Sequence, residues 1–305
     1  MTRFIKSVPL ALSGVALAFA ALGNLLLTYG QALRYICGVV SAVVLALFAL
    51  KLILDFSQAR EDLKSPVALS VLPTSTMALM LLSTYARPFL GAAAVCLWYA
   101  AVITHVAIML VFLKRFVFRL KLESVFPSWF VTYVGIVTAS VTAPAIGARP
   151  VGQAAFFVGF TLFFAVLALN ICRAIKIKQF PQPALPTIAI CTAPMSLSTV
   201  GYMSSFQQHS EFFVYALLTA AATGYIFVSV MMISKLLKLK FYPSYAAFTF
   251  PYVISATAFR LGAAFLAERG LHFFAPAAHI SLWIAIAMVL YVSVRYAIYF
   301  KGALK

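Results

Sequence analysis

The stretch Phe241–Phe265, FYPSYAAFTFPYVISATAFRLGAAF, has the length of a membrane-spanning helix and carries two prolines, Pro243 and Pro251. About 20 helical residues cross the roughly 30 Å hydrocarbon core of a bilayer. A proline inside a helix removes a backbone hydrogen bond and bends the axis, which a membrane helix tolerates only where protein or water satisfies the freed carbonyl. Phe250 stands directly before Pro251, at the expected bend. Taken alone, the stretch fits two interpretations equally: a kinked core helix with a lipid-facing phenylalanine, or a bent helix beside a pathway.

The composition places the whole chain in a membrane. Its 305 residues are 64% hydrophobic and 10% charged with a mean hydropathy of +1.04, which indicates a polytopic membrane protein without a separate soluble domain. The net charge of +17 lies at the ends of apolar segments, so it indicates topology and not nucleic-acid binding. The four cysteines lie in apolar segments without a metal-ligand spacing, so we expect neither a metal nor another cofactor.

Ten apolar segments follow one another along the chain. We place them at 8–28, 33–56, 66–86, 89–112, 127–147, 151–173, 186–206, 211–234, 243–266 and 275–300. The connections inside successive pairs are short, which predicts antiparallel neighbours. The chain is therefore predicted to form a single transmembrane domain, 1–305, of five helical hairpins at 8–56, 66–112, 127–173, 186–234 and 243–300.

A proline repeat supports five equivalent hairpins. The odd-numbered segments begin at Pro9, Pro66, Pro127, Pro186 and Pro243. The successive spacings are 57, 61, 59 and 57 residues, and a nearly fixed period indicates one structural unit used repeatedly. Three odd segments carry a second proline seven or eight residues further on, namely Pro73, Pro194 and Pro251.

Polarity also alternates along the chain. The odd segments hold 24 serines and threonines, whereas the even segments hold 9. Hydroxyl groups in lipid need partners, so hydroxyl-rich helices belong inside, against protein or water. Packing between helices explains part of this count but not its alternation. We therefore predict an all-α fold with a quasi-fivefold inner ring of odd helices around a central pore and an outer ring of even helices.

Lysine and arginine predict the orientation. Of the 23 such residues, 18 lie at the two chain ends or in the connections between hairpins, and only Arg34, Arg87, Arg149, Arg260 and Arg269 lie on the other side. Cytoplasmic loops carry the excess of basic residues in membrane proteins. Both termini are therefore expected in the cytoplasm, with the chain spanning a cell inner (plasma) membrane many times.

The sequence contains no constellation typical of an enzyme. Its six acidic residues lie at segment ends or in loops, so no carboxylate is expected near the bilayer centre, which argues against cation conduction. His105 and His279 lie on even segments, where packing roles are expected. No GxSxG, HExxH or phosphate-binding glycine loop is present. An uncharged, hydroxyl-lined route with a basic cytoplasmic mouth suits an anion or a neutral solute.

These features together resemble the tellurite-resistance TehA / C4-dicarboxylate transporter family, which includes the plant slow-type anion channels. The strings similar to that family are Ser65-Pro66-Val67, Leu72-Pro73-Thr74, Phe126-Pro127-Ser128, Ala193-Pro194, Phe248-Thr249-Phe250-Pro251 and the segment from Ser255 to Phe259. The resemblance covers essentially the whole chain. It implies a homotrimer whose subunits each hold a pore, occluded by a phenylalanine at the position of Phe250.

Two functions remain open at this stage, with a structural or scaffolding membrane protein as a third. The first is a gated anion channel of the bacterial inner membrane, with Phe250 held in the pore by the bend at Pro251. The alternative is a secondary transporter or exporter of C4-dicarboxylates, sulfite or tellurium oxyanions. The candidate pore-lining residues are Gly14, Pro73, Thr74, Gly135, Pro194, Ser196, Thr199 and Phe248. Arg260 is a candidate for attracting anions at the outer mouth, unless it only reaches the membrane interface.

Overall fold

The computed structural model describes residues 2–304, and within that range every regular element is helical. The elements are α1 (Thr2–Lys6), α2 (Leu12–Leu26), η1 (Leu27–Tyr29), α3 (Gln31–Leu54), α4 (Phe56–Asp62), α5 (Pro66–Val71), α6 (Thr74–Leu90), α7 (Ala92–Phe112), η2 (Leu113–Val117), η3 (Leu122–Ser124), α8 (Trp129–Tyr133), α9 (Val137–Ile146), α10 (Arg149–Lys176), η4 (Gln182–Thr192), α11 (Ala193–Ser205), α12 (Glu211–Ser234), η5 (Leu236–Lys238), η6 (Pro243–Phe248), α13 (Phe250–Ala267) and α14 (Ala275–Leu304). Grouped by continuity, they make ten helices that are long and apolar enough to cross a membrane.

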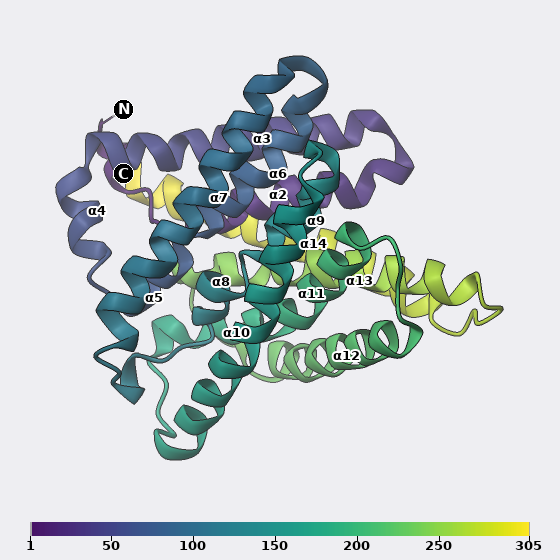
Figure 1. Cartoon of the computed structure of the whole chain (residues 1–305). Helices are drawn as coiled ribbons and strands as arrows, with labels where there is room; N and C mark the ends of the chain where they lie inside the picture. The colour runs from purple at the N-terminus through teal and green to yellow at the C-terminus, as the bar shows by residue number, and fades with distance from the viewer. Residues whose placement is uncertain (1, 305) are drawn as a thin grey trace.

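Consecutive spans form the five predicted hairpins (Figure 1). Four of the five tight turns contain a glycine with positive φ, which residues with a side chain rarely adopt. These glycines are Gly30, Gly91, Gly147 and Gly270. The turns therefore reverse the chain within a few residues and leave each pair of helices antiparallel.

Burial separates the spans into two rings. The odd-numbered spans are 61–78% buried inside the protein, and the even-numbered spans are 28–33% buried. The odd spans also pack on one another in chain order, from α2 to α6, α9, α11 and α13, and α13 packs back on α2. This contact order closes a ring of five inner helices, as the proline repeat and the polarity predict.

Four of the five inner segments are divided into two helical elements in their first half, whereas the sequence predicted a bend at Pro251 inside one helix. α5 ends at Val71 and α6 begins at Thr74, while η6 ends at Phe248 and α13 begins at Phe250. Pro251 therefore lies in the first turn of a new helix and not at a bend inside one. The first turn tolerates proline because its missing N–H would have no partner in the helix.

Hydroxyl groups bridge every seam between neighbouring inner helices. The bridges are Ser13 with Thr74 (2.7 Å), Ser70 with Ser128 (2.6 Å), Ser140 to the Gly201 carbonyl (2.9 Å), Thr192 with Ser255 (2.7 Å) and Thr249 to the Gly14 carbonyl (3.4 Å). Each of these bridging hydroxyls therefore has its partner inside the ring. Packing between inner helices thus accounts for much of the serine and threonine excess in the odd segments.

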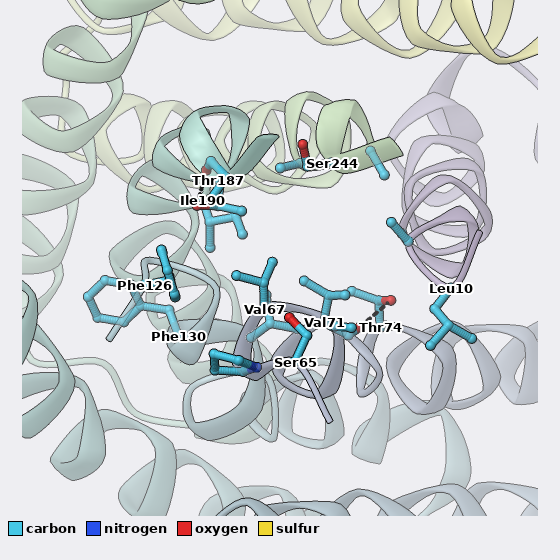
Figure 2. Close-up of a pocket in the computed structure, with 18 of the residues that line it drawn as sticks. Leu10, Ser65, Val67, Val71, Thr74, Phe126, Phe130, Thr187, Ile190 and Ser244 are labelled. Atoms are coloured by element: carbon cyan, nitrogen blue, oxygen red, sulfur yellow. Dashed lines mark hydrogen bonds between the residues drawn. The ribbon is translucent and has the colours of Figure 1, made fainter. Parts of the chain in front are cut away.

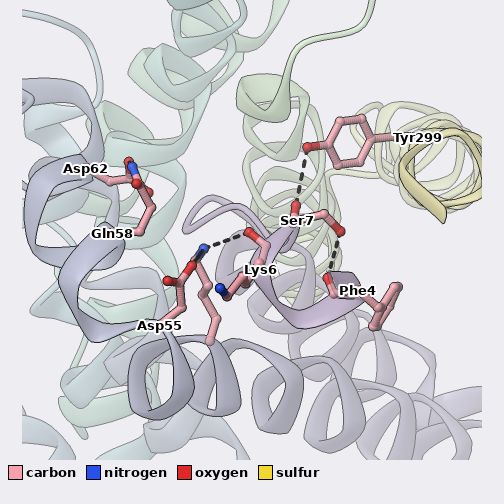
Figure 3. A network of polar contacts seen from close by, with 8 residues as sticks. Phe4, Lys6, Ser7, Asp55, Gln58, Asp62 and Tyr299 are labelled. Carbon is pink, nitrogen blue, oxygen red and sulfur yellow. Dashed lines mark hydrogen bonds and ion pairs between the residues drawn. The ribbon is translucent and has the colours of Figure 1, made fainter. Parts of the chain in front are cut away.

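The two described chain ends lie together on one face (Figure 1). The ring centroids of Phe4 and Phe300 are 5.1 Å apart, and the Tyr299 hydroxyl donates to the Ser7 carbonyl over 3.3 Å. On the same face, the buried Lys51 ammonium donates to the Lys6 carbonyl (2.7 Å) and pairs with Asp55 (2.5 Å; Figure 3). These contacts attach α1 to α14 and to the end of α3. We call this the terminal face.

Candidate functional site

A cavity of about 980 Å³ lies inside the inner ring and reaches the terminal face. All five inner segments contribute to its wall, mostly through the residues before or at their interruptions. Figure 2 shows side chains converging on it from α2's leading turn (Leu10), α5 (Val67 and Val71) and η4 (Thr187 and Ile190). Four of the five inner segments thus border the cavity around the point where one helical element ends and the next begins.

The cavity ends about halfway through the inner ring. Its deepest lining residue on each inner segment is Leu17, Met77, Gly135, Leu197 or Pro251. Phe250 lines this end together with Pro251 and is only 7% exposed. Its ring is held by the non-helical Thr249 before it (φ −100°, ψ −82°) and by the first turn of α13 after it. Phe250 thus occupies a defined position at the end of the cavity.

The structure separates the candidate residues into two groups. Gly14, Thr74, Gly135, Pro194, Phe250 and Pro251 line the cavity, whereas Pro73, Ser196, Thr199, Phe248 and Arg260 lie outside its lining. Phe248 is fully buried, with its ring centroid 4.7 Å from that of Tyr245. Ser196 bonds Ser255 (2.9 Å) at the seam between α11 and α13. The two neighbouring phenylalanines therefore have different surroundings, and only Phe250 borders the cavity.

The two lining glycines make room for neighbouring helices. A Cβ added at Gly135 would lie 2.8 Å from the Met77 sulfur and 3.2 Å from the His105 ring. A Cβ at Gly14 would lie 3.3 Å from the Cβ of Ala246 on the adjacent inner segment. Both directions point into helix contacts, so these glycines allow the inner helices to approach closely. The sequence offered both only as candidate pore-lining residues.

Arg260 lies near the end of the molecule opposite the terminal face. Its guanidinium donates to the Leu25 carbonyl and to the Thr28 hydroxyl (3.2 Å). A cation at the last carbonyls of a helix is stabilised by the helix dipole and satisfies groups that lack an intrahelical partner. Arg260 therefore caps α2 in this structure.

The hydroxyl groups on the cavity wall are largely occupied. Thr187 donates to the Ala184 carbonyl (2.6 Å) and Ser244 donates to the Pro183 carbonyl (2.5 Å). Thr74 bonds Ser13 and the Val71 carbonyl. The wall is consequently more apolar than the serine and threonine count predicted. Because each of these hydroxyls has its own protein partner, it is not free to donate to a solute without breaking that bond.

The mouth of the cavity is not the basic funnel that we expected. Among the lining residues that the structure describes, Lys121 is the one cation, and it shares the mouth with Glu61, Asp62 and Glu123. Lys64, outside the lining, pairs with Glu61 over 2.6 Å. The basic residues at the ends of the outer helices thus surround the terminal face as a whole, while the rim itself carries mixed charge.

His105, for which the sequence predicted a packing role on an outer helix, also contacts the inner ring. It lies on the outer helix α7, yet its side chain is fully buried and reaches two inner segments. Its Nδ1 lies 2.8 Å from the Thr76 hydroxyl and its Nε2 lies 3.1 Å from the Thr132 carbonyl. The only hint in the sequence was a histidine within an otherwise apolar segment, because the inward rotation of α7 at this point depends on packing.

Comparison with known families gives one match that spans the chain. A family model described as a voltage-dependent anion channel (SLAC1) matches residues 4–297. No curated protein matches the chain.

Proposed function

Since the chain belongs to the voltage-dependent anion channel (SLAC1) family, we propose that it is a gated anion channel of a bacterial inner membrane whose pore is closed by Phe250. The ten apolar helices indicate a multi-pass membrane protein, and the family is one of anion channels and transporters. The phenylalanine gate, the bacterial membrane and the orientation with cytoplasmic termini are part of the proposal.

The observation that supports the gate most directly is the end of the cavity at Phe250. The cavity extends inward from the terminal face and is lined by all five inner segments. Phe250 borders its deep end. An anion passing this ring would exchange hydration for an apolar surface that offers no hydrogen bond, which costs free energy. The ring thus acts as a barrier both by its volume and by excluding water.

Planar-bilayer recordings of the reconstituted protein test this proposal. Chloride currents and reversal potentials under anion gradients should be compared for the wild type and Phe250→Ala. Because about 1.36 kcal/mol corresponds to a tenfold change in rate, loss of a barrier of a few kcal/mol should raise conductance by at least about tenfold. A Phe250→Ala variant that folds normally but conducts no better than the wild type would show that this ring is not the gate.

A secondary transporter or exporter of C4-dicarboxylates, sulfite or tellurium oxyanions is the second candidate. His105 favours it, because a buried titratable group close behind Met77 and Gly135 at the cavity end could serve a coupled proton. The same recordings separate the two functions. A channel reverses at the equilibrium potential of the permeant anion, whereas a proton-coupled transporter shifts its reversal potential when only the proton gradient changes.

The family resemblance also supports a homotrimer in which each subunit holds its own pore. The inner ring closes within one chain, so the cavity needs no residue from a second copy. Oligomerisation would then occur through outer helices, which expose large apolar side chains such as Ile36, Phe164 and Ile233.

A further inference from the structure

The wall of the cavity suits an apolar solute body. Its volume of about 980 Å³ is at the upper end of the range for pockets that hold drug-sized organic molecules. Val67, Val71 and Ile190 present aliphatic side chains to it, and Phe126 and Phe130 add two aromatic rings (Figure 2). The nearby hydroxyls bond the protein itself. Such a wall gains free energy by covering alkyl groups, and it offers little to a bare ion.

The charges at the rim disfavour a doubly charged solute. Lys121 is the single lining cation among the residues described, and the carboxylates of Asp62 and Glu123 lie at the same mouth. Sites that recognise carboxylates or phosphates tightly commonly use arginine, whose planar fork binds two oxygens at once. No arginine is among the lining residues in the described part of the chain. A dianion would meet one lysine for two charges, with carboxylates beside it.

We propose that the cavity selects organic monoanions with an apolar body, such as alkanesulfonates and alkyl monocarboxylates, over dianions of the same length. The anionic head lies at the rim near Lys121, and the alkyl body lies against Val71 and Ile190, on the terminal-face side of Phe250. The inference rests on the proposed function for its physiological meaning, since the anions selected here are those offered to the gate. Binding itself requires no conduction.

Protection of an engineered cysteine tests the inference. In a variant lacking the four native cysteines, Val71→Cys should react with a small water-soluble thiol reagent, and alkanesulfonates should slow that reaction. Alkanesulfonates stay ionised, so the protection measured is that of the anion and not of a neutral acid. Each buried methylene strengthens binding by up to about fourfold. The concentration that gives half-protection should therefore fall about tenfold from butanesulfonate to hexanesulfonate, and about tenfold again from hexanesulfonate to octanesulfonate. Hexane-1,6-disulfonate should require a concentration at least about tenfold higher than hexanesulfonate.

Matched variants distinguish binding in the cavity from a general detergent-like action of the alkanesulfonates on the protein. Val43→Cys, on the lipid-facing side of α3 and 56% exposed, should show no chain-length-dependent protection. Lys121→Gln should weaken protection by every alkanesulfonate by a similar factor. The double variant Asp62→Asn with Glu123→Gln should reduce the difference in half-protecting concentration between hexanesulfonate and hexane-1,6-disulfonate. The inference would be overturned if the mono- and disulfonate protect equally, if protection does not depend on chain length, or if Val43→Cys is protected in the same way. It would also be overturned if Lys121→Gln has no effect or if Val71→Cys does not react.

The outcome of the cysteine-protection experiment is independent of the outcome of the conductance experiment on Phe250→Ala. If Phe250→Ala carries no anion current but the protection pattern holds, the proposed channel function fails and the monoanion site stands. If chloride current rises in Phe250→Ala but protection shows no dependence on alkyl length, the channel stands and the inferred selectivity fails.

Discussion

Phe248 and Phe250 are two residues apart and have opposite surroundings. Phe250 borders the cavity, whereas Phe248 is fully buried against Tyr245. Thr249 between them departs from helical geometry and separates η6 from α13. The two rings therefore lie in different environments, which makes the pair a matched comparison within one local structure.

We expect Phe248→Ala to lower stability without opening the pore. Deleting a buried phenylalanine side chain costs about 3–5 kcal/mol in a well-packed interior. Thermal unfolding in detergent should therefore shift downward for Phe248→Ala, while its chloride conductance in bilayers should stay within about twofold of the wild type. Phe250→Ala should cost less stability than Phe248→Ala, because the Phe250 ring borders the cavity and is not packed on all sides, and it should raise conductance strongly. A conductance increase in Phe248→Ala above that in Phe250→Ala would contradict the gate assignment.

We expect Gly135→Ala to destabilise the protein more than Gly14→Ala does. The added methyl group at Gly135 would meet the Val131 carbonyl, the Met77 sulfur and the His105 ring, whereas at Gly14 the nearest atom is 3.3 Å away. Overpacking of this kind costs about 1–3 kcal/mol. Unfolding temperatures of the two variants, measured side by side, provide the check. An equal or smaller shift for Gly135→Ala would show that α7 moves away without cost.

At the scale of elements, interruption of the inner segments matters more than bending. Four inner segments start a new helix one-third to one-half of the way along, at Thr74, Val137, Ala193 and Phe250, whereas α2 starts after a turn at Leu12. The residues before these starts form the wall of the cavity. The first one or two turns after these starts still border the cavity, and the residues beyond them form the tightly packed half of the ring. The inner ring is thus divided into a hollow half and a closed half.

Cysteine accessibility along α11 should reveal this division. In a cysteine-free background, Leu197→Cys lies at the cavity end and should react with a water-soluble reagent applied from the terminal face. Ser198→Cys, one residue further along and fully buried outside the lining, should react at least about tenfold more slowly, because closed packing excludes the reagent. Phe250→Ala should raise the Leu197→Cys rate. Comparable rates at the two cysteines would show that the wall is not where the structure places it.

At the scale of the whole molecule, the even number of spans places both described chain ends on the terminal face. The chain ends and the connections between hairpins carry most of the lysine and arginine, so we propose from the positive-inside rule that this face lies in the cytoplasm. In the proposed orientation the cavity would open to the cytoplasm, and the proposed gate at Phe250 would separate it from the outer half of the ring. Anions leaving the cell would reach the gate through this cavity.

Labelling in intact cells should confirm this orientation. Cysteines introduced at Lys114 and at Lys301 should be protected from a membrane-impermeant reagent in intact cells and become reactive after permeabilisation. A cysteine at Arg149, at the start of α10 on the opposite side, should react in intact cells. External labelling at Lys114 would reverse the assignment of the cavity mouth.

The oligomeric state is the remaining prediction at this scale. Native mass spectrometry of the purified protein should give a mass of three chains, each of 33.2 kDa. A monomer that retains anion current would remove the trimer from the proposal and leave the pore assignment intact, because the inner ring closes within one chain.

The sequence alone determined the number of spans, their pairing, the division into inner and outer helices and the expected side of the termini. These properties depend on local hydrophobicity, turn residues and charge, which each segment carries independently of the others. The candidates Gly14, Thr74, Gly135, Pro194, Phe250 and Pro251 also proved to lie on the cavity wall.

Only the tertiary structure decided which side chains face the cavity. A serine or threonine can bond a carbonyl of its own helix, a neighbouring helix or a solute, and rotation of each helix in the ring selects among these partners. The same rotation turns Ser196 toward Ser255 and brings His105 inward from an outer helix. Because rotation is set by the packing of five helices at once, composition and spacing along one segment do not contain it.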